Sequence, residues 1–378
     1  MNLYLEEKIH LKEALKHQRI CLTTDTWTSV QNQNYMSLTA HWIDNQWQLQ
    51  RKVLNFCFVS DHSGDTLGRT VEECLLEWDI GNIFTITVDN ASSNNTLIEY
   101  LKNVTKDWES TVCNNEFMHV RCCAHIVNLV VKKGWEASNA SVGRIRTAVL
   151  FAKSSPGRLV LFKRCVLKEK IAEKGLFSLD CDTRWNSTYL MLEDTVPFEK
   201  AFKRLGDESK YYLPYFSKVG GPPTAEDWLE AKKLISVFKL FYNVTVRFSG
   251  QLYVTSSNFF HDFMLMHNKI ALLIRGKEEE AGLGAMAENM KPKFDKYWDN
   301  NDGLNPLLFI AVALDPRYKV KYLDFCFSNI YNKEKAKCFT KKVEDGLIRL
   351  FEWYVEADST ATSNGPICML DVARDAIF

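Results

Sequence analysis

The stretch Ile83-Phe-Thr-Ile-Thr-Val-Asp89-Asn-Ala-Ser-Ser-Asn-Asn95 decides the fold that we expect for this chain. Apolar and polar side chains alternate as far as Asp89, which is the pattern of a β-strand with one more polar face. Small polar residues follow, and they favour the start of a helix near Asn94. An acid at the carboxyl end of a strand, beside a helix start, is where α/β folds place their chemistry. An ordinary helix-capping aspartate is the alternative.

A second acid stands in a similar setting, in Ile20-Cys-Leu-Thr-Thr-Asp25-Thr-Trp27. The predicted order is three strands, a helix and a fourth strand, at residues 19–27, 35–43, 47–59, 67–78 and 83–89. Because such a crossover is almost always right-handed, we expect the fourth strand to lie parallel to the first. Asp25 and Asp89 would then lie at matching ends of neighbouring strands. Two carboxylates so placed can hold a pair of Mg²⁺ or Mn²⁺ ions for phosphodiester displacement, although a third acidic ligand is needed.

Composition restricts the partners of this 378-residue chain, which is long enough for two compact units. Lysine plus arginine and aspartate plus glutamate both number 47, so any signal for nucleic acid must be local. No apolar run approaches a membrane span, and the start is not a signal peptide, so no membrane partner is expected. The eleven scattered cysteines indicate reduced thiols in the cytosol or nucleus.

The second half of the chain has a different character. A short strand near residue 119 runs into an apolar helix, and from about Ser141 onward the pattern is almost wholly helical. Breaks at Gly220-Gly-Pro-Pro223 and Gly282-Leu-Gly284 divide it, and no repeat of 20 to 50 residues indicates a solenoid.

The motif Cys122-Cys-Ala-His125 has the spacing of half a zinc site. A structural zinc needs four ligands, and no second Cys or His pair follows at a usual distance. We therefore interpret Cys122 and His125 as packing or hydrogen-bonding residues and do not expect zinc.

The segment Asp180-Cys-Asp-Thr-Arg184-Trp185-Asn-Ser-Thr188 is a candidate for contact with DNA. Arg184 could bind a phosphate with two hydrogen bonds, and Trp185 could stack on an unpaired base. A capped helix start with a core tryptophan is an equally good interpretation of the local pattern.

Residues 141–174 form the one strongly basic segment, with nine lysines and arginines against two glutamates. Such a segment is often a solvated helix face, but it is also the best candidate in the chain for binding the DNA backbone. The sequence favours neither. The candidate DNA-binding residues are Arg144, Arg146, Arg158, Lys163 and Arg164.

Taken together, these stretches resemble the hAT superfamily of DNA transposases, in the plant RICESLEEPER-like lineage whose members carry a BED-type zinc finger. The resemblance follows the chain in order through seven segments: Leu22-Thr-Thr-Asp-Thr-Trp-Thr-Ser29, Thr87-Val-Asp-Asn-Ala-Ser-Ser-Asn94, Arg121-Cys-Cys-Ala-His-Ile-Val-Asn-Leu-Val130, Thr183-Arg-Trp-Asn-Ser-Thr-Tyr-Leu-Met-Leu192, Phe241-Tyr-Asn-Val-Thr245, Met290-Lys-Pro-Lys-Phe-Asp-Lys-Tyr-Trp298 and Leu314-Asp-Pro-Arg-Tyr318.

The resemblance implies an α/β plus all-α fold, in which an RNase H-like core, a mixed sheet flanked by helices, is interrupted by a large helical insertion. It assigns Asp25 and Asp89 to an acidic triad that uses divalent metal on DNA. It places Cys122 and His125 in a Cys-x-x-His motif, and Arg184 and Trp185 in an Arg-Trp motif near the transposon end. The expected divisions are a lead-in helix over 1–18, the core over 19–140, the insertion with the continuation of the core over 141–356, and a loop with the start of a dimerisation segment over 357–378.

Two departures from the family pattern shape the functional expectation. No BED finger precedes the core, and the third acid, a glutamate of the dimerisation segment, would fall after Phe378. Nothing in the pattern nominates Glu344, Glu352 or Glu356 as its replacement. We therefore expect a nuclear, transposase-derived protein that binds DNA non-specifically, forms at most a weakened homodimer and does not cut. The alternatives are an active Mg²⁺-dependent transposase or nuclease, and a protein-interaction module on a transposase scaffold.

Overall fold

The computed structural model describes residues 2–108, 111–172, 175, 177–181, 184–250, 253–276, 281–299 and 304–361, and it divides the chain into two compact units. Unit 1 comprises Met1–His125, Gly250–His261 and Asn300–Phe378, and unit 2 comprises Ile126–Ser249 and Asp262–Asp299. The first boundary between these units lies inside helix α4 (Cys123–Trp135). The physical reason is that the apolar side chains of α4 already pack among unit 2 helices, as Trp135 does against Trp185 and Phe238.

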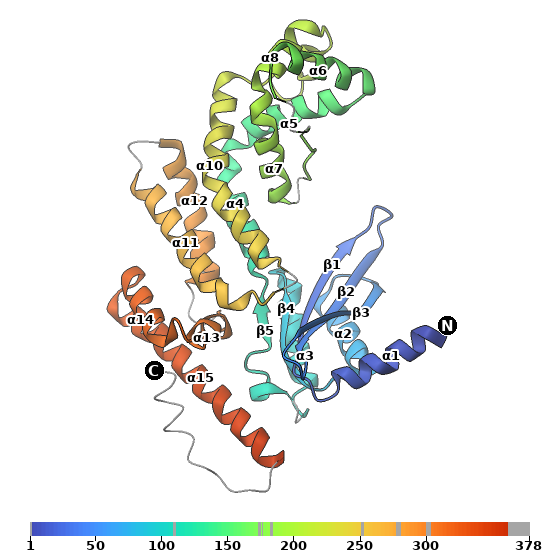
Figure 1. Ribbon diagram of the computed structural model, residues 1–378, viewed down its shortest axis with the longest axis vertical. Coiled ribbons are helices and arrows are strands. Elements are labelled where there is room, and N and C mark those ends of the chain that lie inside the picture. The colour runs from blue at the N-terminus through green and yellow to red at the C-terminus, as the bar shows by residue number, and fades with distance from the viewer. Residues whose placement is uncertain are drawn as a thin grey trace. The chain divides into compact units, whose positions relative to one another are not determined.

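Unit 1 is built on a five-stranded mixed sheet with the strand order β3-β2-β1-β4-β5 (Figure 1). The strands are β1 (Ile20–Thr28), β2 (Asn34–Ile43), β3 (Leu49–Val59), β4 (Ile83–Val88) and β5 (His119–Arg121). The first three pair antiparallel, whereas β4 pairs parallel with both β1 and β5. The predicted strands, hairpin and parallel crossover are thus confirmed.

Helices cover one face of this sheet. Strand residues such as Leu22, Met36 and Ile86 form a core with α2 (Gly64–Trp78) and α3 (Ser92–Val104). The two helices approach closely at Gly64, where an added Cβ would lie 2.4 Å from the Ser93 carbonyl oxygen. This approach fixes the start of α3, which begins two residues before the expected Asn94. Its N-cap, Ala91, makes no side-chain capping bond, contrary to the expected polar capping.

The first helix and three late helices complete unit 1: α1 (Asn2–Leu15), α13 (Leu307–Ala313), α14 (Lys319–Ile330) and α15 (Lys333–Ala361). The Arg349 guanidinium of α15 donates two hydrogen bonds to the Glu116 carboxylate, at 2.8 and 2.6 Å. The Arg19 guanidinium lies over the Tyr354 ring, 4.1 Å from its centroid. Helix α15 extends to Ala361, into the loop expected over 357–378, and the rest of that expected segment lies outside the described residues.

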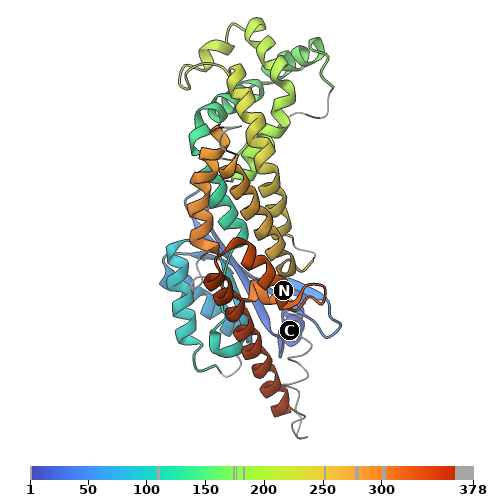
Figure 2. The same ribbon diagram turned by 90° about the vertical axis from the view of Figure 1, so that its left-hand side faces the viewer.

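Unit 2 is helical. It contains α5 (Asn139–Lys153), α6 (Pro156–Lys168), α7 (Trp185–Thr195), α8 (Glu199–Glu208), α9 (Tyr212–Tyr215), α10 (Ala225–Phe248), α12 (Ala281–Trp298), and most of α4 and of α11 (Ser256–Arg275). The long helices lie alongside one another (Figures 1 and 2). In the described part of the chain, no helix has the length and apolar composition needed to cross a lipid bilayer.

Among the described residues of unit 2, three ion pairs have a buried carboxylate, and one of them joins Arg247 of α10 to Asp262 of α11. Arg144 on α5 binds Asp227 on α10, with Nε 2.7 Å from Oδ2. Arg146, two residues later on α5, binds Asp180 with Nη2 2.6 Å from Oδ2, and Thr188 on α7 donates to the same oxygen at 2.8 Å. Both aspartate side chains are 2% exposed. Removing one partner of such a pair leaves an uncompensated buried charge.

We expect Arg144→Met to lower the free energy of unfolding of unit 2 by about 3–5 kcal/mol, because the Asp227 carboxylate loses its counter-charge. Urea unfolding followed by tryptophan fluorescence measures the change. Lys232→Met is the matched control, because Lys232 pairs with Glu199 on the solvent-exposed surface and its loss should cost no more than about 1 kcal/mol. Equal effects of the two substitutions would contradict the structural role of the Arg144–Asp227 pair.

The same pair predicts an acid-sensitive stability. Burial raises the pKa of the Asp227 carboxyl, but bonds from Arg144, the Thr224 N–H and Ser141 outweigh burial and hold the pKa well below its usual range. Because the folded pKa lies below the unfolded value, the stabilisation is present above about pH 4 and is lost as the pH falls through the lowered pKa. Unfolding free energies measured between pH 5 and pH 2 should therefore fall less steeply in Asp227→Asn than in the unchanged chain.

Candidate functional site

Asp25 and Asp89 lie side by side at one edge of the sheet. The parallel register pairs Thr23 with Thr87, and two further residues along each chain bring Asp25 beside Asp89 on the same face. Paired strands lie about 4.8 Å apart, and the last pair, Thr23 with Thr87, lies two residues before the acids. Asp25 is exposed in the second half of β1, and Asp89 is half-buried directly after β4.

The hydrogen bonds of the two acids leave oxygens available to a cation. Asp25 Oδ1 accepts the Thr26 N–H at 3.0 Å. Asp89 Oδ1 accepts the Ala91 N–H at 2.8 Å and the Asn94 Nδ2–H at 2.6 Å. In the described part of the chain, neither Oδ2 makes a hydrogen bond or ion pair. Two free carboxylate oxygens from adjacent strands are the hard ligands that Mg²⁺ and Mn²⁺ take in proteins, so the pair fits a divalent cation.

Cys122 completes the row of residues at this edge. The pairing of Thr87 with Val120 continues to Asp89 and Cys122, and the Cys122 N–H donates to the Val88 carbonyl at 2.8 Å. Burial raises the pKa of the Cys122 thiol, and the charges of Asp25 and Asp89 raise it further. A protonated thiol is a poor metal ligand. His125 lies one turn later on α4, and among the described residues no three His, Cys, Asp or Glu side chains are placed to hold a metal together.

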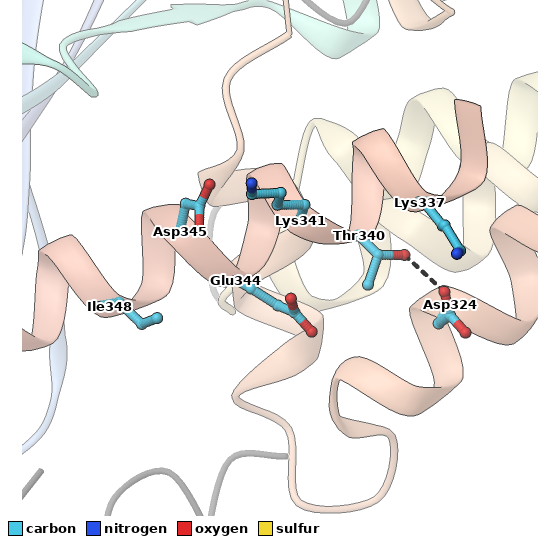
Figure 3. A pocket seen from close by; sticks show the side chains of 7 residues that line it. All are labelled: Asp324, Lys337, Thr340, Lys341, Glu344, Asp345 and Ile348. Carbon is cyan, nitrogen blue, oxygen red and sulfur yellow. Dashed lines mark hydrogen bonds between the residues drawn. The ribbon is translucent and has the colours of Figure 1, made fainter. Parts of the chain in front are cut away.

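Glu344 and Glu352 of α15 have environments of their own. Glu352 directly precedes Trp353 and Tyr354, whose rings contact Arg19. Arg19 precedes Asp25 by six residues, which span about 20 Å of extended strand. Glu344 lines a different cavity of about 470 Å³ between α14 and α15, beside Asp324 (Figure 3). Burial raises the pKa of the Glu344 carboxyl, and nearby Asp345 and Asp324 raise it further. The described residues therefore provide two acids at the sheet edge.

Sequence reasoning missed several neighbours of the acid pair. Asn94, inside the stretch Ile83–Asn95, is buried and orients the Asp89 carboxylate. Arg121 lies at the end of β5 with Nη2 3.4 Å from Asn95 Oδ1 and adds a positive charge near the start of α3. Thr23 Oγ1 lies 3.1 Å from His41 Nε2 on the acid face. The alternation of β1 alone places Thr23 on the face of Asp25, but placing His41 there requires the register of the β1–β2 hairpin.

Arg184 and Trp185 have separate environments. Arg184 is exposed at the N-cap of α7, so its guanidinium is accessible to an anion. Trp185 is 2% exposed and packs against Trp135, Tyr189 and Phe238. Its ring face is not open to a base, and the core tryptophan that the sequence also allowed describes its surroundings.

The basic segment is largely used inside unit 2. Arg144 and Arg146 bind buried aspartates, and the Arg158 guanidinium lies over the Phe151 ring, 4.2 Å from its centroid. Lys163 and Arg164 on α6 are exposed, and neither forms an ion pair with another described residue. Of the five predicted cations, these two keep their charge available to a phosphate.

Three family models match the chain. The ZBED1 RNase-like domain matches residues 23–117, the ZBED1 RNase-like helical domain matches residues 120–237, and the hAT-like transposase, RNase-H fold, matches residues 257–354. The matches over residues 23–117 and 257–354 lie mostly in unit 1. The helical match over residues 120–237 falls between them in the sequence, as expected for a core interrupted by an insertion.

Full-length relatives match across nearly the whole chain. The Putative AC transposase of Zea mays is 33% identical over 96% of this chain and 44% of its own length. Zinc finger BED domain-containing protein RICESLEEPER 2 of Oryza sativa subsp. japonica is 32% identical over 93% of this chain and 48% of its own length. DAYSLEEPER of Arabidopsis thaliana is 29% identical over 96% and 51%. The chain spans about half the length of these curated relatives.

Because Trp185 is buried and Arg184 is exposed, we expect substitution of Trp185 to destabilise the protein and substitution of Arg184 to change its stability little. Trp185→Ala removes a buried ring and should lower the free energy of unfolding by about 3–5 kcal/mol. Arg184→Ala at an exposed position should change it by no more than about 0.5 kcal/mol. Urea midpoints of both variants test this. A neutral Trp185→Ala would mean that the ring is not part of the core.

Proposed function

The chain belongs to the hAT transposase family, and from this premise we propose that it is a transposase-derived, DNA-binding protein of the nucleus. The observation that carries the proposal is the pair Asp25 and Asp89, held on adjacent parallel strands with one free oxygen each. A pair of this kind suits DNA because a cation between two carboxylates can also bind a phosphate oxygen.

The residues around the pair have separate tasks in this proposal. Asp25 and Asp89 would hold a divalent cation, Mg²⁺ or Mn²⁺, which when bound supplies charge stabilisation to a phosphodiester. Asn94 keeps the Asp89 carboxylate oriented through its 2.6 Å hydrogen bond. Arg121, beside the start of α3, is suited to bind a neighbouring phosphate.

We propose further that these 378 residues by themselves do not cut DNA. Two-metal displacement requires both ions to be held, and the described residues offer two acids at the site. The rival function, Mg²⁺-dependent strand cleavage, is favoured by one observation, the intact geometry of the acid pair. An assay for nicking therefore separates the two functions.

Contacts with the DNA backbone come from exposed cations that form no ion pair with another described residue. Lys163 and Arg164 of α6 meet this condition, and Arg184 at the start of α7 is also accessible. Such contacts recognise phosphates and not base sequence. Binding should therefore be non-specific and weaken steeply with added salt.

We expect the double charge reversal Lys163→Glu and Arg164→Glu to weaken binding of a 30-base-pair duplex. It should also flatten the plot of log affinity against log salt by about 2, because two phosphate contacts are lost. Fluorescence anisotropy between about 50 and 200 mM salt measures both, in the range where the dependence is strong. Lys321→Glu with Lys333→Glu, at exposed positions of unit 1, makes the same change in net charge.

The outcome of this comparison separates the functions. A loss confined to the Lys163 and Arg164 variant supports DNA binding through α6. Equal losses in both double variants would mean that only net charge matters. Absence of duplex binding by the unchanged chain at about 50 mM salt, where phosphate contacts are strongest, would overturn the DNA role and favour a protein-interaction module.

Incubation with supercoiled plasmid in Mg²⁺ or Mn²⁺ tests the second proposal. We expect no nicking above the level of Asp89→Asn, because the site lacks a third acidic ligand among the described residues. Asp315→Asn, on a carboxylate bound to Arg317 away from the pair, controls for loss of charge. Nicking that Asp89→Asn abolishes and Asp315→Asn retains would establish the enzyme.

A further inference from the structure

Four aromatic side chains gather on the sheet face opposite the core, and we call them the aromatic platform: Trp27 of β1, Tyr35 of β2, and Phe56 and Phe58 of β3. The Tyr35 ring lies nearly parallel to the rings of Trp27 and Phe56, at 24° and 27°, with centroids 6.0 and 5.4 Å away. Phe58 meets Tyr35 edge-on at 6.3 Å. The four rings therefore form one continuous surface across three strands.

The platform is exposed to solvent. Trp27 is 37% exposed, Phe56 60% and Phe58 61%, whereas Met36 and Leu38 on the opposite face are fully buried. Side chains thus alternate along β2, so that Met36 and Leu38 face the core and Tyr35 lies on the second, uncovered apolar face. Adjacent aromatic rings left in water on one rigid surface mark a binding site for a partner.

The position of the platform indicates the partner. Trp27 follows Asp25 by two residues on the same face of β1, and the register pairs Trp27 with Tyr35 and Asp25 with Ser37. Two residues of strand span about 7 Å, comparable with the step between nucleotides in an extended strand. A backbone phosphate at the acid pair would therefore bring its neighbouring base onto the platform.

The rim of the platform is polar. Tyr35 Oη donates to Gln33 Oε1 at 2.7 Å. A nucleobase, with an apolar face and a polar edge, matches rings bordered by a hydroxyl and an amide group, whereas an apolar peptide matches the rings alone.

We propose that the aromatic platform stacks the unpaired bases of single-stranded DNA whose backbone passes the acid pair. The proposal rests on the proposed DNA function and names its substrate as a strand with unpaired bases. Aromatic side chains on open sheet faces bind single strands in this way, because every base has a flat π-face. A duplex keeps its bases stacked inside and cannot use the platform.

The test compares a 20-nucleotide oligothymidine with a duplex of the same length by anisotropy at one salt concentration. We expect the double substitution Phe56→Leu and Phe58→Leu to weaken single-strand binding at least about 5-fold, the low end for one stacked base, and to leave duplex binding unchanged. Phe56→Tyr with Phe58→Tyr keeps the rings and should keep the affinity. Phe325→Leu, at a phenylalanine of α14 that is 66% exposed, is the matched control.

Each remaining outcome is decisive. Equal single-strand affinity in the leucine and tyrosine variants would overturn the proposal that the platform stacks bases. Duplex binding by the same variants would still support the proposed function. Loss of self-association in the leucine variant, seen by sedimentation with DNA affinity unchanged, would identify a second copy of the chain as the occupant and overturn the proposal. Absence of both single-strand and duplex binding by the unchanged chain would remove the proposed function as well.

Discussion

The parallel pairing of β1 with β4 is the constraint on which the rest of unit 1 depends. Its register, Thr23 with Thr87, aligns two segments that are sixty-four residues apart in sequence, and Asp25 and Asp89 each follow two residues after that pair. The buried side chains Leu22 and Ile86 hold that register, because a slip by one residue would turn the core face toward water. Fold stability and site geometry therefore rest on the same contacts.

The acid pair is maintained by groups that contribute no charge of their own. Asn94 and the Ala91 N–H bind the same oxygen of Asp89, and its other oxygen accepts no hydrogen bond from a described residue. Gly64 allows α2 to approach the first turn of α3 and so fixes the position of Asn94. This support extends from the core to the carboxylate without any ion pair, and the acids keep their charge for a ligand.

Positive charges are used differently in the two units. In unit 2, Arg144 and Arg146 neutralise the buried carboxylates of Asp227 and Asp180, and these pairs connect α5 to α10 and to the segment before α7. A buried pair adds little net stability but becomes costly when broken, so such arginines are fixed by the fold. Only cations on the outer surface, such as Lys163 and Arg164, stay available to a partner. A local excess of positive charge in the sequence thus overstates the charge that a phosphate would meet.

The sequence by itself determined the strands, the parallel crossover and the two acids, because alternation and turn residues are local and the core demands one register. The sequence left open whether Trp185 is buried or stacks on a base, and whether the basic segment is a solvated helix face or binds DNA. The local pattern of a helix start or of a charged helix is the same whether other helices or solvent surround it. Only the tertiary structure decided that Trp185 is buried and that Arg144 and Arg146 are paired. It also joined Trp27, Tyr35 and Phe56 into one surface. The physical reason is that these outcomes depend on partners from other strands and helices, whose approach no local pattern specifies.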